Sequence, residues 1–406
     1  METTELLIVG CGPAGATAAR EAARAGIATV VLEKDAQVGT KRVCAAGLRP
    51  GFCETFDLPR SIIHFDTPRL ALFDPAGREH EVFFGPGHTT TREELDGTMG
   101  VLATSEGAQI RTQTLFRTLE STAEGSVVEY ADYRSGERRR IVARAVFLAQ
   151  GASAPYERAR AASDGSLAAF SYDGWNDGLM TTLQYRVYLD RPASPIAYRT
   201  LELHYYPSAD GRLIVAWMFP KRDHLAIGLG LVGKLAGASL REELEGFTER
   251  IRARLYPGAT VLRIKQEGHL LYGGLPRPRV SDGSVMVGGT AAGLVDATNG
   301  EGIFEAAMSG RLAAEAVRMH RNDGPRAATR YARVLHDRFA RRLAHRVHLM
   351  HFLEARPARF RMLFEQLASS PKFSNALQRE DEQRSRADRL YLYAHAVRFA
   401  IRAARA

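Results

Sequence analysis

The chain has 406 residues, of which 45% are hydrophobic and 25% charged, and its formal net charge at pH 7 is +9. No apolar run reaches the length of about eighteen residues that a transmembrane helix needs, and three cysteines at these spacings fit neither a disulfide framework nor a zinc site. Because an apolar strand begins within the first few residues and leaves no room for a signal peptide, we expect a cytoplasmic protein.

The N-terminal segment predicts a nucleotide-binding unit. The apolar run Leu6–Val9 is followed by an alanine-rich helix and a second apolar run, Ala28–Leu32. Three glycines in the spacing G-x-G-x-x-G separate the first strand from the helix, namely Gly10, Gly12 and Gly15. The first allows a tight turn, the second lets the backbone approach a diphosphate, and the third lets helix and strand pack closely. Glu33 ends the second strand, where a carboxylate can hold a ribose diol. This order predicts dinucleotide binding at the helix N-terminus, where free N–H groups attract phosphate.

The middle of the chain alternates strand and helix patterns. Short strands around a turn at Asp74–Gly77 precede a helix, which we expect to begin after the cap residue Thr91 and to continue to Leu102. Strand patterns follow at residues 109–114, 126–133 and 141–148. Alternating apolar residues then predict an antiparallel sheet in a second domain, with strands at residues 181–189, 200–206, 212–219 and 225–232.

A second glycine-rich motif follows a buried strand at residues 284–289. Small residues continue through Asn299-Gly300-Glu301-Gly302 into a helix that is expected to end near Arg318. Small side chains permit backbone contact with a large planar ligand, and the N–H groups of Gly300–Gly302 can stabilise negative charge on a flavin ring. The alternative is a tight turn that only packs helices together. A helix is also expected at 241–255, and residues 325–406 are helical in pattern, broken by Pro357 and Pro371.

Four segments in this order resemble the geranylgeranyl reductase family of flavoproteins, which is built like p-hydroxybenzoate hydroxylase. They are VGCGPAGATAA at residues 9–19, the loop Cys44–Gly47, the segment Ala216–Pro220, and Ala291–Gly302. The resemblance covers nearly the whole chain. It implies an α/β fold with a Rossmann-like FAD-binding domain of the p-hydroxybenzoate hydroxylase type (GR2), an antiparallel β-sheet substrate domain and a helical C-terminal segment. It also implies bound FAD and reduction of isolated C=C bonds in the prenyl chain of a lipid, pigment or quinone.

The domains implied by this resemblance are discontinuous. The FAD-binding domain is expected to comprise residues 1–60, 88–155 and 275–320. The substrate domain is expected to comprise residues 61–87 and 156–274, and the basic C-terminal segment residues 321–406.

The resemblance also implies the site residues. The expected FAD-binding set is Gly10, Gly12, Pro13, Ala14, Gly15, Glu33, Lys34, Arg42, Ala45, Gly47, Arg92, Gly151, Thr290, Ala292, Gly293, Gly300, Glu301, Gly302 and Ile303. Trp217, Phe219 and Tyr206 are expected to wall the isoprenoid substrate, although an aromatic pair at alternating strand positions is also ordinary packing. Cys44 matches the loop cysteine beside the flavin and is the candidate proton donor, the alternative being a small buried hydrophobic residue.

Several positions depart from the family pattern, among them Val215 and Ala216 before Trp217, and two others keep other functions open. Thr290 and Gln150 stand where the family has aspartates. One alternative is an FAD-dependent monooxygenase or halogenase on the same scaffold, and another is a non-catalytic flavin-binding accessory protein. No second G-x-G-x-x-G in a strand–helix context marks a nicotinamide domain. Electrons are therefore expected from transiently bound NAD(P)H or from a ferredoxin-like protein.

The positive charge is concentrated at the C-terminal end. Residues 311–406 hold 21 Lys and Arg against 9 Asp and Glu, and many of the arginines are interleaved with aromatic and apolar residues. A basic amphipathic helix can lie on an anionic leaflet, which suits a water-insoluble substrate. We therefore expect peripheral attachment to the inner membrane face, the alternative being a solvated helical face. Nucleic acid is not expected, because no nucleic-acid motif accompanies the charge. No metal is expected, because His345, His348 and His351 do not share one helical face.

Overall fold

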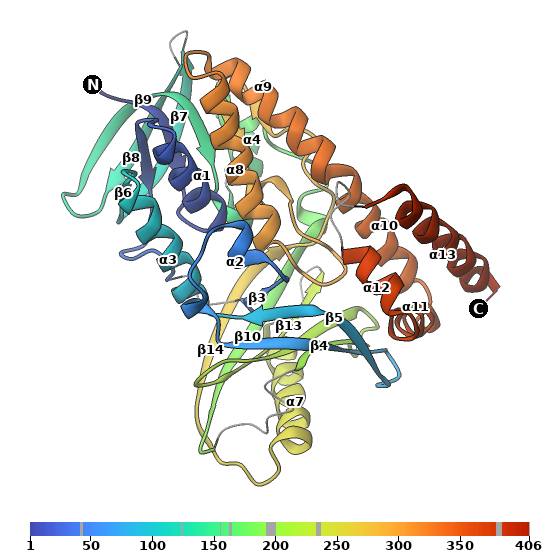
Figure 1. The fold of residues 1–406 in the computed structure, drawn as a ribbon. Helices are drawn as coiled ribbons and strands as arrows, with labels where there is room; N and C mark the ends of the chain where they lie inside the picture. Colours follow the sequence, from blue (N-terminus) through green and yellow to red (C-terminus); the bar gives the residue numbers. More distant parts are fainter. Residues whose placement is uncertain are drawn as a thin grey trace.

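The structure is a computed structural model that describes residues 1–40, 44–122, 125–154, 156–161, 165–191, 200–232, 237–378 and 384–405. It contains two β-sheets and a set of C-terminal helices that packs against both of them (Figure 1). Arg42, which was expected to bind the cofactor, lies outside the described residues.

The first sheet has β1 (Glu2–Val9) at its centre. This strand pairs in parallel with β2 (Thr29–Leu32) on one side and with β9 (Glu137–Leu148) on the other. Leu6, Leu7 and Ile8 are completely buried, because elements cover both faces of a parallel sheet and its strands become continuous apolar runs. The other strands of this sheet are β6 (Gln109–Arg111), β7 (Thr114–Thr122), β8 (Gly125–Asp132), β15 (Ser281–Asp282) and β16 (Val285–Val287).

Three helices pack on the first sheet, namely α1 (Pro13–Arg24), α3 (Arg92–Ser105) and α8 (Ile303–Met319), and the first glycine motif leads into α1. The expected cap of α3 is confirmed, since the Thr91 hydroxyl accepts a hydrogen bond from the Glu94 N–H at 3.3 Å. Helices α1 and α8 lie side by side in close contact (Figure 1). Gly310 makes this approach possible, because a Cβ there would overlap the Ala14 carbonyl. A Cβ at Gly15 would likewise overlap the Gly10 carbonyl, so the third glycine of the motif is needed for packing.

The second sheet follows the expected strands at residues 181–232 but extends further. In spatial order its strands are β14 (Val261–Tyr272), β10 (Leu179–Leu189), β13 (Leu225–Val232), β12 (Leu213–Pro220), β11 (Thr200–Pro207), β4 (Phe65–Phe73), β5 (Glu79–Thr89) and β3 (Gly47–Leu48). The four strands expected at residues 181–232 pair antiparallel with one another, as predicted, and the sheet has one parallel pair where β11 lies beside β4. No short turn joins these two strands, so their relative direction is not set by a hairpin. Helix α7 (Gly237–Leu255) covers one face of the sheet.

Shorter elements connect the two sheets. The helices among them are α2 (Phe52–Thr55), α4 (Tyr156–Ala161) and α5 (Gly165–Ala168), and 3₁₀ turns lie at Arg60–Ile62, Gly151–Ser153, Asn176–Gly178 and Gly289–Ala292.

The C-terminal segment is helical, as expected, with breaks at Pro357 and Pro371. Its elements are α9 (Gly324–Leu335), a π-helical turn at His336–Ala340, α10 (Arg341–Glu354), α11 (Ala358–Ser369), α12 (Pro371–Gln378) and α13 (Arg386–Arg405). The buried Tyr331 of α9 donates a hydrogen bond to the Val287 carbonyl of the first sheet at 2.8 Å. Apolar residues of α10, α11 and α13 pack instead on the second sheet. None of the helices in the described ranges is both long and apolar enough to cross a membrane.

Candidate functional site

A cavity of about 1740 Å³ lies between the two sheets and is closed on a third side by the C-terminal helices. Most of the expected site residues line it: Gly10, Gly12, Pro13, Ala14, Glu33, Lys34, Cys44, Ala45, Gly47, Arg92, Gly151, Trp217, Phe219, Thr290, Gly300, Glu301, Gly302 and Ile303. Four expected residues do not line it, namely Gly15, Tyr206, Ala292 and Gly293. The tertiary structure thus brings together residues from both sequence motifs and from the second sheet.

The nucleotide end of the cavity is formed by the first glycine motif. Gly12 caps α1 without a side-chain hydrogen bond, so the first N–H groups of this helix are available to a ligand. The Glu33 carboxylate accepts hydrogen bonds from the N–H groups of Cys11 at 2.8 Å and Asp35 at 2.9 Å. Burial raises the pKa of Glu33, against the effect of these two N–H groups. The carboxylate is therefore fixed at the cavity wall, where it can accept hydrogen bonds from a ribose.

Arg92 stands above the glycine motif on the first turn of α3. Its Nε donates to Asp96 at 2.8 Å, and both side chains are buried. A Cβ on Gly12 would lie 3.6 Å from the Arg92 guanidinium. The guanidinium therefore lies close to the backbone of the glycine motif. Burial works against the charge of Arg92, yet the Asp96 carboxylate and the Cys44 sulfur together raise its pKa. Asp96 was not singled out in the sequence, although its i, i+4 spacing from Arg92 is a recognisable helix pair.

The second glycine motif lines the part of the cavity that is expected to hold the flavin ring, which we call the flavin end. Gly302 caps α8, again without a side-chain hydrogen bond, so a second helix N-terminus faces the cavity. The Asp296 carboxylate accepts from the Thr298 N–H at 2.9 Å and pairs with Arg346 of α10 at 3.3 Å. Arg49 pairs with Glu301 at 2.6 Å, and burial raises the pKa of this glutamate while Arg49 opposes the rise. Ion pairs with Arg49 and with Arg346 thus hold the loop that precedes α8.

The Cys44 loop, defined here as Cys44–Gly47, lies between the two ends of the cavity. Cys44 is partly exposed, and its Sγ accepts a hydrogen bond from the Ala46 N–H at 3.3 Å. Ala46 has a positive φ of 47°, and a Cβ on Gly47 would lie 2.6 Å from the Phe219 ring. The loop therefore runs directly beneath an aromatic residue that was expected to wall the substrate.

Trp217 and Tyr205 form the polar edge of the second sheet's cavity face. Trp217 Nε1 donates to the Gln184 side chain at 3.0 Å, and the Tyr205 hydroxyl donates to the Thr298 carbonyl at 2.7 Å. Tyr206 lies on the opposite face, packed against Phe247 of α7, because successive strand residues point to opposite sides. Tyr205, rather than the expected Tyr206, is therefore the cavity-facing phenol.

The apolar end of the cavity was missed in the sequence. It is lined by α10–α13 through Leu349, Met350, Leu353, Phe360, Leu363, Phe364, Leu367, Phe373 and Phe399. Apolar residues at spacings of three and four in residues 349–367 were the available signal. The arginines between these apolar residues make positive charge the dominant feature of this segment in the sequence.

The site fits FAD, since it has two uncapped helix N-termini for charged groups, an acid fixed at the nucleotide end and an elongated cavity between them. The FAD binding domain family matches residues 3–58. The geranylgeranyl diphosphate reductase of Synechocystis is 30% identical over 339 residues, which cover 79% of this chain and 77% of that protein. The chain belongs to the geranylgeranyl reductase family.

Other proteins are similar to this chain in sequence or in fold. The digeranylgeranylglycerophospholipid reductase of Thermoplasma acidophilum is 27% identical over 363 residues, covering 84% of this chain and 85% of that protein. The crystal structure of a geranylgeranyl bacteriochlorophyll reductase-like protein from the same organism has a TM-score of 0.76 at 21% identity, covering 97% and 96% of the two chains. A flavin-dependent brominase shares the fold at a TM-score of 0.66 and 15% identity, covering 92% and 91%. The expected fold class and the FAD cofactor are confirmed.

Gly228 is the basis of the first prediction. This glycine lies opposite Trp217 in the β12–β13 pair, and a Cβ there would overlap the indole ring. We expect Gly228→Ala to tilt the ring into the cavity and to lower kcat/KM for a prenyl lipid at least about tenfold, because small displacements at a reacting centre are costly. Bound FAD, measured by absorbance, should be unchanged. Gly246→Ala on α7 is the control, since a Cβ there meets only Arg250 at 3.5 Å; equal losses in both variants would contradict the prediction.

Proposed function

We propose that this protein reduces isolated C=C bonds in a geranylgeranyl-type prenyl chain with FAD as its cofactor. The observation that carries the proposal is the continuity of the cavity from the flavin end to the apolar end formed by α10–α13. A prenyl chain offers neither charge nor hydrogen-bonding groups, so a protein holds it by apolar contact along its length. The names of the relatives in Synechocystis and Thermoplasma support the same substrate class.

The chemistry requires a hydride and a proton, because no carbonyl activates an isolated alkene. Reduced FAD, when bound, supplies the hydride to one alkene carbon. Cys44 is proposed to donate the proton to the other carbon, since its sulfur lies on the cavity wall beside Arg92. Trp217 and Phe219 are proposed to hold the chain against the ring and to exclude water from the reacting carbons.

The proposed cofactor contacts divide between the two motifs. The N–H groups at the start of α1 and the Arg92 guanidinium are proposed to hold the diphosphate, and Glu33 the ribose. Thr290 and Gly300–Gly302 are proposed to contact the ribityl chain and the ring. Thr290 offers a neutral hydroxyl where the family has a carboxylate, so it binds a ribityl hydroxyl without charge assistance.

An anaerobic single-turnover experiment tests this function. The purified holoenzyme is reduced chemically and mixed with a geranylgeranyl lipid in the absence of oxygen. Flavin reoxidation with a product heavier by pairs of hydrogen atoms supports the reductase. Reduced flavin that ignores the lipid but yields an oxygenated product once oxygen enters supports a monooxygenase instead. Repeating the reduction with NADPH in place of the chemical reductant distinguishes a nicotinamide donor from a protein donor of the ferredoxin type.

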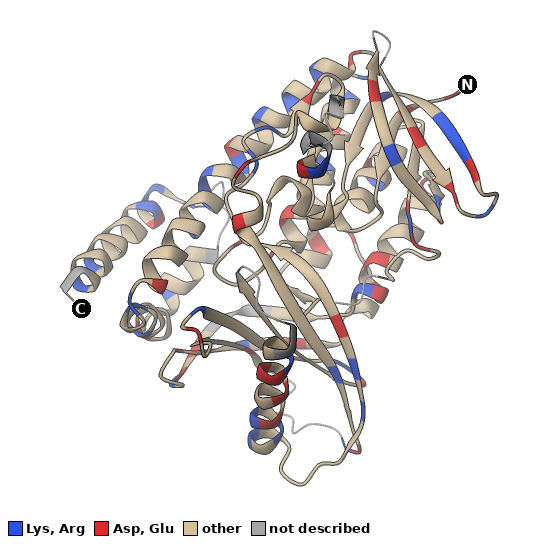
Figure 2. Cartoon of the chain, turned by 180° about the vertical axis from the view of Figure 1, so that it is seen from behind, with Lys and Arg blue, Asp and Glu red and all other residues tan. Residues whose placement is uncertain are grey.

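We further propose that α13 rests on an anionic membrane surface at the inner membrane face. Leu390, Tyr393, Val397 and Ile401 recur along one side of the helix and are 70%, 71%, 39% and 51% exposed. Figure 2 shows basic residues along the helix that ends at the C-terminus, and all of those in α13 are arginines. Phe399, on the opposite side, is buried and lines the cavity. An apolar stripe flanked by arginines suits an anionic leaflet and places the apolar end of the cavity near the lipid that contains the substrate.

The membrane proposal predicts that the double substitution Leu390→Ser with Tyr393→Ser weakens binding to anionic vesicles by about tenfold, since each removes exposed apolar area from the interface. Flotation with vesicles of anionic and of neutral lipid measures the binding, and added salt should weaken it. The matched control is Leu262→Ser on β14, because Leu262 is 66% exposed but lies on the second sheet. Equal binding of wild type to neutral vesicles would contradict the electrostatic part.

A further inference from the structure

Lys221 is a buried cation that the sequence did not single out. It follows β12 in the turn that leads to β13, and its side chain is only 2% exposed. Placing an ammonium group away from water is costly unless the group is hydrogen bonded and faces an opposite charge. Apolar packing alone therefore does not explain why a lysine stands at this buried position.

The hydrogen bonds of Lys221 are directed at the Cys44 loop. Its Nζ donates to the Ala45 carbonyl at 2.6 Å and to the Ala46 carbonyl at 3.3 Å. Phe219, two residues earlier at the end of β12, packs on Gly47. The end of β12 and the turn after it thus hold the loop at three successive residues, including the one with positive φ.

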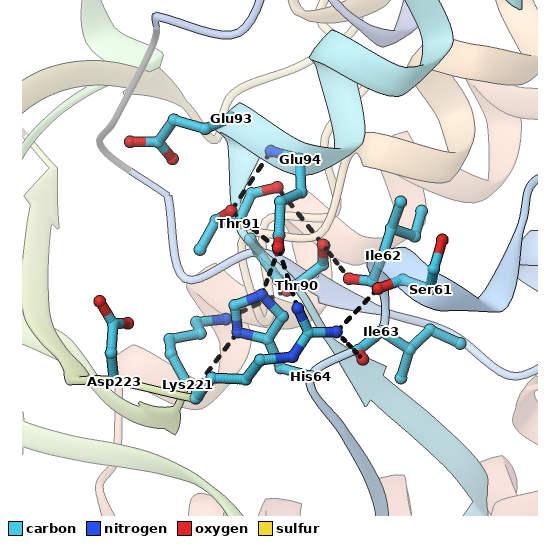
Figure 3. Close-up of polar contacts among 12 residues, drawn as sticks. Ser61, Ile62, Ile63, His64, Thr90, Thr91, Glu93, Glu94, Lys221 and Asp223 are labelled. Atoms are coloured by element: carbon cyan, nitrogen blue, oxygen red, sulfur yellow. Dashed lines mark hydrogen bonds and ion pairs between the residues drawn. The ribbon is translucent and has the colours of Figure 1, made fainter.

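The charges around Lys221 come from several elements. Figure 3 shows it with Glu93 and Glu94 of α3, and with His64 and Asp223. Burial lowers the pKa of Lys221 to about 7; the Cys44 sulfur, Glu93 and Glu94 oppose the fall, and Arg186 of β10 adds to it. His64 is hydrogen bonded to Glu94, and burial lowers the pKa of both His64 and the neighbouring His224. The Cys44 sulfur thus contributes to the electrostatic environment of two cations, Lys221 and Arg92.

We propose that Lys221 is a positioning residue of the reductase: it fixes the Cys44 loop through the Ala45 and Ala46 carbonyls, and its ammonium stabilises the Cys44 thiolate that remains after proton donation. This inference rests on the proposed function, in which Cys44 is the acid. The proton that leaves Cys44 bonds to one alkene carbon while the cofactor's hydride bonds to the other, and the thiolate takes a proton from water before the next turnover. A positive charge beside the sulfur lowers the cost of the thiolate.

The protonation of Lys221 gives this role a pH dependence. Because its pKa is near neutral, the side chain carries its charge below about pH 7 and loses it progressively above. A neutral amine still donates hydrogen bonds to both carbonyls, so the loop stays in place. Only the stabilisation of the thiolate is lost as the pH rises.

The test measures the alkylation of Cys44 by iodoacetamide in the holoenzyme, without a prenyl substrate. Cys11 and Cys53 are 1% and 2% exposed, so peptide mass spectrometry follows Cys44 selectively, with Cys44→Ala as the blank. We expect Lys221→Met to slow alkylation near neutral pH about tenfold and to displace its pH profile to higher pH, because thiolate stabilisation by a nearby cation is lost. An unchanged profile, or a uniformly faster reaction, would overturn the proposal.

Two further variants complete the test. Arg222→Gln removes a charge from the next residue, which contacts Ser61, Ile63 and Glu94 rather than the Cys44 loop, and should leave the rate within about twofold of wild type. Lys221→Arg keeps a positive charge that does not titrate near neutral pH. The alkylation profile of this variant should therefore lack the change near pH 7 that the deprotonation of Lys221 causes in the wild type. If Lys221→Met does not fold, a Lys221→Arg profile identical to wild type overturns the proposal by itself. Since no turnover is measured, failure of the reductase assay would leave this result interpretable.

Discussion

Replacing Cys44 with alanine is expected to leave FAD bound and to lower the rate of prenyl reduction by a factor of about 10² to 10⁴, the usual contribution of a positioned acid. The side chain lies on the cavity wall, and its loop is held by Lys221 and packed beneath Phe219. Alanine keeps the contacts of Lys221 and Phe219 with the loop and removes the thiol, together with the hydrogen bond that its sulfur accepts from the Ala46 N–H. Single-turnover flavin reoxidation by a prenyl lipid measures the rate, and the flavin spectrum measures cofactor binding.

The matched control for this prediction is Cys53→Ala. Cys53 belongs to α2 and is buried, and burial raises the pKa of its thiol. It does not line the cavity, so its replacement should change stability by about 1 kcal/mol without changing the rate. Unchanged turnover in Cys44→Ala would exclude Cys44 as the acid, while the reductase function itself would stand.

Glu305→Gln is expected to lower the free energy of unfolding by about 3 kcal/mol, because it leaves buried cations without a carboxylate. Glu305 of α8 is completely buried and pairs with Arg49 at 2.7 Å and with Arg342 at 2.8 Å. Arg49 follows the Cys44 loop and Arg342 belongs to α10. The glutamate therefore joins three segments of different origin at the flavin end of the cavity. Urea denaturation of the holoenzyme measures the change, and we also expect weaker retention of FAD.

Glu315→Gln on the same helix provides the comparison. Its side chain is 46% exposed, and it pairs with Arg330 at 3.8 Å, so the variant should lose less than about 0.5 kcal/mol. The two substitutions make the same chemical change and differ in burial. Similar unfolding free energies in the two variants would show that the ion pairs of Glu305 contribute no more than a surface contact.

Features that depend on neighbours in the sequence were predictable. The strand, glycines, helix and acid of the first motif occur within a short segment, and each has a local physical role. The cap at Thr91 and the helix breaks at Pro357 and Pro371 were predicted for the same reason, since a hydroxyl or a pyrrolidine ring acts within one helical turn. The second glycine motif was recognisable because small residues before a helix N-terminus leave backbone N–H groups accessible.

Features that depend on distant segments could not be predicted. Lys221 and Ala45 are 176 positions apart, and no pattern around Lys221 distinguishes a buried lysine from an exposed one. The apolar residues among the C-terminal arginines were predicted to contact a membrane, whereas apolar residues of α10–α13 form the end of the cavity in the structure. Glycine is needed at positions 228 and 310 only because another element approaches each of them closely, which the sequence around them does not show.

Tyr205 and Tyr206, which are adjacent in the chain, illustrate the difference between features that could be predicted and features that could not. The cofactor motif, the order of the elements and the opposite orientation of two adjacent strand residues follow from local geometry, so they could be inferred from the chain alone. The packing of the folded chain selects the tyrosine that faces the cavity, the lysine that holds the Cys44 loop and the helices that enclose the apolar end. Those choices depend on how the two sheets and the C-terminal helices pack, and packing is set by contacts between residues that are far apart in the chain.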